Sequence, residues 1–81
     1  MARHECIMEI VYVTLVMTAL IAGQDFERHE RMTSLEDCFS IAPKRFAEMQ
    51  HGKFPGSPDL IRVEAIANIG VGCVAGIGDA L

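Results

Sequence analysis

Basic residues are scarce in this chain of 81 residues, which has 7 lysines and arginines against 11 aspartates and glutamates and a net charge of −4 at pH 7. The only adjacent basic pair is Lys44 and Arg45. Nucleic-acid binding is driven by clustered cations that release counterions from phosphates, and anionic membrane surfaces also attract clustered cations. The composition therefore argues against nucleic acid and anionic lipid surfaces as partners.

The chain also lacks the short motifs that mark catalytic and metal sites. No spacing such as C-x-x-C or H-x-x-x-H joins any two of the candidate metal ligands, which are His29, Cys38, His51 and Cys73. No carboxylate pair, serine elbow or phosphate-binding loop stands out. The sequence therefore predicts a protein that is not an enzyme, that uses no cofactor or metal, and that binds an unknown protein partner through its surface.

Cysteine is rare as well, with three residues in the chain. Cys6 lies near the N-terminus, which leaves Cys38 and Cys73 as an even pair in the remainder. An even number of cysteines is typical of an exported chain with a disulfide framework. Closing the loop between these two would stabilise the fold by about 3.5–4 kcal/mol in a chain-entropy model. The alternative is that both are unpaired and buried as small hydrophobic residues.

The uncharged segment of residues 10–23 decides where the protein is expected to act. Its fourteen residues are fewer than the roughly 20 that cross a bilayer as a helix, but they fit the apolar core of a signal peptide. We therefore expect residues 1–23 to be a signal peptide, cleaved after Ala22 or Gly23, and the protein to be periplasmic or secreted.

Two alternatives for this segment stay open. In the first, residues 7–23 form an uncleaved anchor in the inner membrane and contact a larger membrane partner, which makes the chain a single-span membrane protein. In the second, residues 10–16 form a buried strand of a small cytosolic domain, since most of them are β-branched and such residues suit strands. A cytosolic domain would keep its cysteines reduced.

The clearest local signal begins at Thr33. With Glu36 three residues later, it fits a capping box, in which each side chain accepts a hydrogen bond from a free backbone N–H. An amphipathic helix is predicted from this cap to about Gln50, with a kink at Pro43 and a left-handed C-terminal residue at Gly52. Its predicted apolar face consists of Leu35, Cys38, Phe39, Ala42, Phe46 and Met49.

The last part of the chain alternates between two kinds of residue. Odd positions from Ile61 to Ile77 are apolar, whereas the even positions include charged residues, Asn and Gly. A period of two is typical of a strand with one buried face, and Cys73 lies on that face. For residues 58–69, a helix with Ser57 as its N-cap is a competing prediction.

The order of these features resembles that of small uncharacterised exported proteins of proteobacteria and their phages. The resemblance rests on the hydrophobic leader, on the sequence T-S-L-E-D-C at residues 33–38 and on C-V-A at residues 73–75. It implies a leader and a disulfide, and no activity. We therefore expect an N-terminal hydrophobic helix, followed in residues 24–81 by a small α+β domain. In this domain a kinked amphipathic helix packs on one or two strands and is tied by a Cys38–Cys73 disulfide.

Overall fold

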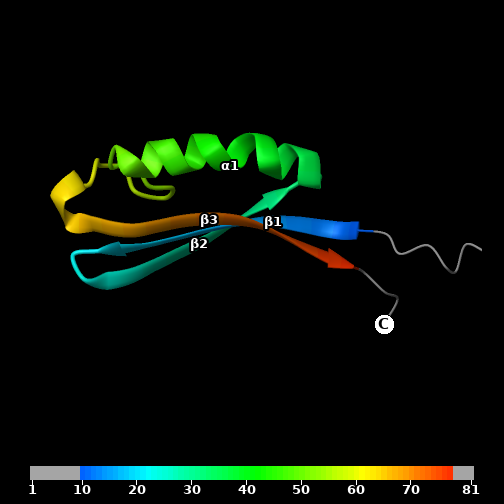
Figure 1. The fold of residues 1–81 in the computed structure, drawn as a ribbon, viewed down its shortest axis with the longest axis horizontal. Helices are drawn as coiled ribbons and strands as arrows, with labels where there is room; N and C mark the ends of the chain where they lie inside the picture. The colour runs from blue at the N-terminus through cyan, green and yellow to red at the C-terminus, as the bar shows by residue number, and fades with distance from the viewer. Residues whose placement is uncertain (1–9, 78–81) are drawn as a thin grey trace, which may run out of the picture.

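The computed structural model describes residues 10–77, which form a three-stranded antiparallel sheet with one helix on one face (Figure 1). The elements in chain order are β1 (Ile10–Ile21), β2 (Gln24–Met32), α1 (Leu35–Gln50), the 3-10 turn η2 (Val63–Ala65) and β3 (Ile66–Ile77). The strand order is β2-β1-β3, so β1 is the central strand. Within the described residues, no helix covers the other face of the sheet.

The side chains of β1 alternate between the two faces of the sheet and supply most of the core. Val13, Leu15, Met17 and Ala19 face α1 and are at most 5% exposed. Tyr12, on the other face, is 46% exposed. The period of two in burial is the one that a pleated strand imposes. The long apolar run is therefore the centre of the folded unit.

The expected fold, in which an N-terminal hydrophobic helix precedes a helix packed on one or two strands, is wrong. Residues 10–21 pair with β2 along one edge and with β3 along the other, so that three strands share the core. β-branched residues lose rotamer freedom in a helix and pack well in a strand, and the strand alternative for residues 10–16 matches β1. No helix among residues 10–77 is long and apolar enough to cross a bilayer.

The boundary drawn after residue 23 falls in the turn between β1 and β2. Ala22 and Gly23 have φ values of 51° and 81°, and Ile21 pairs with Gln24, which gives a two-residue hairpin turn. Positive φ at both central residues matches the right-handed twist of the strands. Residues on both sides of the boundary thus belong to one sheet. Cleavage at this point stays a prediction.

Helix α1 begins one residue later than the predicted cap. Ser34 is the N-cap, and its hydroxyl accepts a hydrogen bond of 3.1 Å from the Asp37 N–H. The Thr33 hydroxyl donates to the Asp37 carboxylate instead, and Glu36 is exposed. The N-cap is therefore Ser34 rather than Thr33. Thr33 and Ser34 are each followed three residues later by an acidic residue, so the sequence pattern does not choose between them.

The far end of α1 agrees with the sequence. The helix continues through Pro43 to Gln50, and Gly52 follows with φ +89°. The N–H of Gly52 donates to the Met49 carbonyl and that of Lys53 to the Glu48 carbonyl, the two bonds of a Schellman motif. The predicted left-handed residue at Gly52 is confirmed.

Strand β3 begins at Ile66, after the short turn η2, so the helix predicted as an alternative for residues 58–69 is wrong. The strand pattern read from Ile61 is also wrong before Ile66, where Val63 is 53% exposed. Ile69, Val71 and Cys73 pack against the core, as the alternation predicts. A bulge at Asn68 (φ 57°) interrupts this alternation. On the N-terminal side of the bulge, Ile66 contacts the core instead of Ala67. The extra residue of a bulge shifts the face of every residue that precedes it.

Candidate functional site

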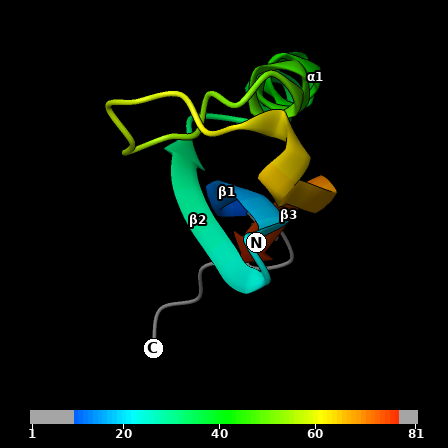
Figure 2. The ribbon, with the colours of Figure 1, turned by 90° about the vertical axis from the view of Figure 1, so that its left-hand side faces the viewer.

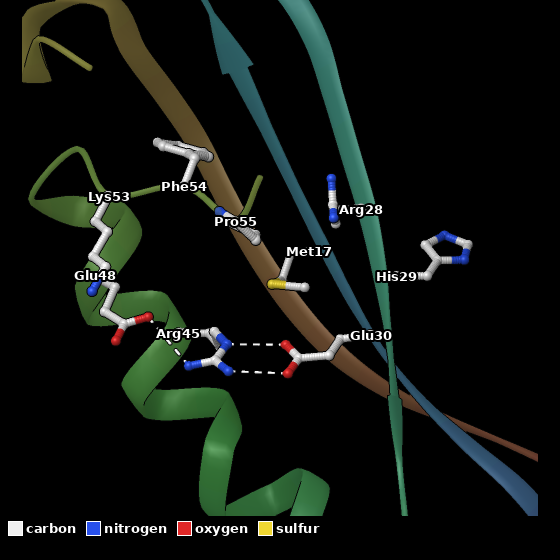
Figure 3. A pocket seen from close by; sticks show the side chains of 9 residues that line it. All are labelled: Met17, Arg28, His29, Glu30, Arg45, Glu48, Lys53, Phe54 and Pro55. Carbon is white, nitrogen blue, oxygen red and sulfur yellow. Dashed lines mark hydrogen bonds and ion pairs between the residues drawn. The ribbon is translucent and has the colours of Figure 1, made fainter. Parts of the chain in front are cut away.

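A pocket of about 450 Å³ lies between α1, β2 and the loop that follows α1. Figure 3 shows it from close by, with the Arg45 and Glu30 side chains meeting next to Met17. We call it the α1–β2 pocket. Its lining residues are Met17, Arg28, His29, Glu30, Arg45, Glu48, Lys53, Phe54 and Pro55.

The pocket exists because a charged residue lies on the inner face of α1. The residues of α1 that face the sheet follow the helical spacing of four, three and four, namely Cys38, Ala42, Arg45 and Met49. On β2, Glu30 lies opposite Leu15, a residue of the core, and therefore faces the helix as well. Two opposite charges thus face each other across the layer between helix and sheet.

Arg45 and Glu30 form a two-fold hydrogen-bonded ion pair. Nε and an Nη of Arg45 donate to the two carboxylate oxygens of Glu30, both at 3.0 Å. The other Nη donates to Glu48 at 3.3 Å, one turn along the helix. The Arg45 side chain is 24% exposed and that of Glu30 35%. Paired, parallel hydrogen bonds of this kind fix geometry as well as charge.

This pairing shifts both titrations in the same sense. The hydrogen bonds from Arg45 hold the pKa of the Glu30 carboxyl below its ordinary value, and nearby Arg28 adds to the shift. The bond to Glu30 raises the pKa of Arg45, and Glu48 adds to this. Burial opposes both shifts and is the smaller effect. Both groups are therefore ionised at neutral pH.

Apolar residues form the floor of the pocket and are firmly packed. Met17 is fully buried and Phe54 is 2% exposed. The ring of Phe54 meets that of Phe26 edge to face, with centroids 5.0 Å apart and planes at 82°, an arrangement that aromatic pairs prefer. The loop that carries Phe54 is held close to the sheet in this way. The pocket therefore combines a rigid apolar floor with a charged rim.

Two cations of the rim have no carboxylate within ion-pair distance among residues 10–77. These are Arg28, from β2, and Lys53, from the loop. The guanidinium of Arg28 lies directly against Gly56 of the same loop. His29 differs from them, because it bonds Glu27 at 2.7 Å and its ring points away from the ion pair in Figure 3. Within residues 10–77, the cationic groups of the pocket without an ion-pair partner are thus Arg28 and Lys53, which we call the free cations.

The lining holds cations, carboxylates and apolar groups, and it includes no serine, threonine or cysteine as a nucleophile. Among the described residues, no three histidine, cysteine, aspartate or glutamate side chains lie close enough to hold a metal ion.

The structure joins Cys38 and Cys73 in a disulfide with Cα atoms 6.1 Å apart, which confirms this pairing. The predicted apolar face of α1 is wrong at one residue. Phe39 is 63% exposed instead of buried, because the inner face of the helix is turned toward Arg45. Arg45 and Glu30 were missed as a pair. Arg45 could have been placed on the inner face of α1 from the sequence, because Cys38, Ala42 and Arg45 follow one another at helical spacings of four and three residues.

Comparisons with family models, with curated proteins and with solved structures found no match for the chain. The site is therefore interpreted from its own geometry.

Proposed function

We propose that this protein is a small non-enzymatic binding protein of an oxidising compartment, periplasmic or secreted, and that its α1–β2 pocket binds a ligand that carries a carboxylate. The observation that carries the proposal is the pair of free cations, Arg28 and Lys53, beside the buried floor formed by Met17 and Phe54. Arg45, in contrast, is already neutralised by its carboxylate partners.

The ligand class follows from this division of charge. Arg and Lys side chains bind carboxylates through charge-assisted hydrogen bonds, and these are stronger than neutral ones. The apolar floor favours a ligand with a hydrophobic part beside its carboxylate. A pocket of about 450 Å³ lies within the usual range for small-molecule sites of roughly 300–1,000 Å³. A modified amino acid or the C-terminal residue of a peptide fits this description.

The compartment is proposed from the disulfide alone. Disulfides persist in the periplasm and outside the cell and are rare in the cytosol, and Cys38 is bonded to Cys73. We do not base the compartment on a cleaved leader or a membrane anchor made of residues 1–23. Either one would remove β1 from the sheet, and with it the buried residues Val13, Leu15, Met17 and Ala19.

Ligand binding can be tested with N-acetyl-leucine, and N-acetyl-leucinamide serves as the control without a carboxylate. In NMR titrations of the oxidised chain, N-acetyl-leucine should shift the signals of Arg28, Lys53 and Phe54, and the amide should not. Lys53→Ala should weaken binding by roughly tenfold, the effect of one lost charged hydrogen bond. Lys44→Ala, an exposed lysine outside this pocket, is the matched control. Equal binding of acid and amide would contradict the carboxylate site.

The compartment can be tested by quenching cells of the native host in acid and alkylating thiols under denaturing conditions, which exposes the buried Cys38. Cys38 and Cys73 should resist alkylation until a reductant is added. Alkylation of both residues without reductant would exclude an oxidising compartment.

A further inference from the structure

The two free edges of the sheet differ in charge. β3 is an edge strand of twelve residues with no charged residue and no proline. On the other edge, β2 carries six titratable residues, Asp25, Glu27, Arg28, His29, Glu30 and Arg31. Edge strands present unpaired N–H and C=O groups to other chains, and charged side chains are a usual protection against such pairing. In the part of the chain that the structure describes, the edge of β2 has this protection and that of β3 does not.

The side of α1 above the β3 edge is uncharged too. Arg45 and Glu48 mark the β2 side of the helix, because Arg45 bonds Glu30 and Glu48 lines the α1–β2 pocket. Figure 2 shows α1 above the β1–β3 half of the sheet, with the following loop on the β2 side. By helical spacing, the opposite flank of α1 consists of Leu35, Phe39, Pro43, Phe46 and Gln50. Phe39, at 63% exposure, is a large apolar ring in solvent beside the free edge.

We propose that a second copy of this chain binds this surface, so that two β3 strands pair antiparallel about a two-fold axis and form a continuous six-stranded sheet. The β3 edge surface is defined as the outer edge of residues 70–76 together with this flank of α1. These residues pair with β1 without a register shift, from Thr18↔Gly70 to Tyr12↔Gly76. The segment is therefore regular enough to accept a further strand.

The distribution of charge favours a second copy as the occupant. The chain has a net charge of −4, so two copies repel each other in most orientations. The β3 edge surface is where they can meet without placing like charges together. A two-fold interface must also complement itself, and an antiparallel strand edge does so, since each copy offers the same alternating donors and acceptors. A charged partner would find no opposite charge here.

The proposal can be tested by sedimentation of the oxidised full chain over a hundredfold range of concentration. A reversible dimer is expected. Phe39→Glu should weaken it by roughly a hundredfold, because each dimer contains the new charge twice. Leu60→Glu is the matched control, since Leu60 is 73% exposed and lies in the loop on the β2 side. It should leave the dimer unchanged. Hydrogen exchange of every second amide in residues 70–76 should slow as the dimer forms.

Other outcomes overturn the proposal. A monomer at every concentration would do so, as would a dimer that Phe39→Glu leaves intact. A monomer that co-sediments with phosphatidylcholine vesicles through Phe39 would make lipid the occupant instead of a second copy. Circular dichroism shows whether each variant is folded. If Phe39→Glu does not fold, Val74→Lys on β3, with Val63→Lys as its control at the same 53% exposure, must give the same contrast.

Discussion

Glu30 and Cys73 lie in one row of the sheet, on either side of Leu15, and each is bonded to α1. Leu15 is paired with Glu30 of β2 and with Cys73 of β3. Glu30 accepts two hydrogen bonds from Arg45, and Cys73 is joined to Cys38. The helix is thus held above a single row of the sheet by an ion pair on one side and a covalent bond on the other.

Breaking the covalent bond should destabilise the protein strongly. The two cysteines are 35 positions apart, and a loop of this size constrains the unfolded chain by about 3.5–4 kcal/mol in the chain-entropy model. Small domains have total stabilities of only about 5 kcal/mol or somewhat more. Urea unfolding of the double variant Cys38→Ala, Cys73→Ala should therefore begin at very low denaturant.

The reduced wild-type protein is the control, because it loses the bond without the loss of either sulphur atom. It should resemble the double variant. A reduced protein within about 1 kcal/mol of the oxidised one would show that the disulfide contributes little to the free energy of unfolding.

The ion pair between Arg45 and Glu30 should make the free energy of unfolding decrease at acidic pH. The pKa of Glu30 is lower in the folded state than its ordinary value. The ionised Glu30 carboxylate therefore contributes to the free energy of unfolding at pH values above the unfolded-state pKa of about 4.3. This contribution is lost as the pH falls through the folded-state pKa. Glu30→Gln should lower the free energy of unfolding by about 0.5–1 kcal/mol at pH 7, a value reduced for partial exposure.

Urea unfolding at pH 7 and near pH 3 measures this effect. The difference between Glu30→Gln and wild type should shrink at the lower pH. Glu27→Gln, on the open face of the same strand, is the control and should change stability by less than about 0.5 kcal/mol. A difference that persists unchanged in acid would mean that the Glu30 charge is not its cause.

Local patterns in the sequence predict part of this architecture. The alternation is confirmed for Ile69, Val71 and Cys73 of β3, and the left-handed residue at Gly52 and the Cys38–Cys73 pair are confirmed too. The apolar run of β1 was assigned to a helix, because a strand with neighbours on both edges and an apolar helix look alike when only length and hydropathy are considered. Its place in the sheet depends on pairing with β2, which follows it directly, and with β3, which is far from it in the sequence.

The candidate site depended on relationships that the sequence shows only weakly. The apolar residues of α1 predicted an inner face that includes Phe39. In the structure Phe39 is exposed, because the inner face is turned toward Arg45, which bonds Glu30. An arginine on an inner face is favourable only when a carboxylate meets it. That carboxylate is fifteen positions away on β2, and its direction follows from the β1–β2 register rather than from β2 alone.

The role of β1 as the central strand leads to a direct test. Leu15 is fully buried, so Leu15→Ala should cost about 2–5 kcal/mol, as for other buried leucines. Leu60→Ala, at 73% exposure, should stay within about 0.5 kcal/mol of wild type. A chain of residues 24–81 should fail to fold, because it lacks β1. Dispersed NMR signals from that fragment would instead support a domain that is independent of residues 1–23.

Three glycines allow the contribution of backbone conformation to be separated from that of steric contact. Gly52 has φ +89°, and an added Cβ would overlap the carbonyl oxygen of Ile61. Gly23 has φ +81° with no atom near the added Cβ, and Gly72 has neither feature.

Gly52→Ala should therefore be the most damaging of the three, at more than about 2 kcal/mol, because left-handed strain of about 1–2 kcal/mol is combined with a clash against backbone. Gly23→Ala should show the strain alone, about 1 kcal/mol, and Gly72→Ala should be neutral or slightly stabilising. Urea unfolding at low protein concentration measures all three. If Gly23→Ala were as damaging as Gly52→Ala, backbone strain alone would account for both. Such a result would mean that the contact between Gly52 and Ile61 does not fix the loop beside the α1–β2 pocket.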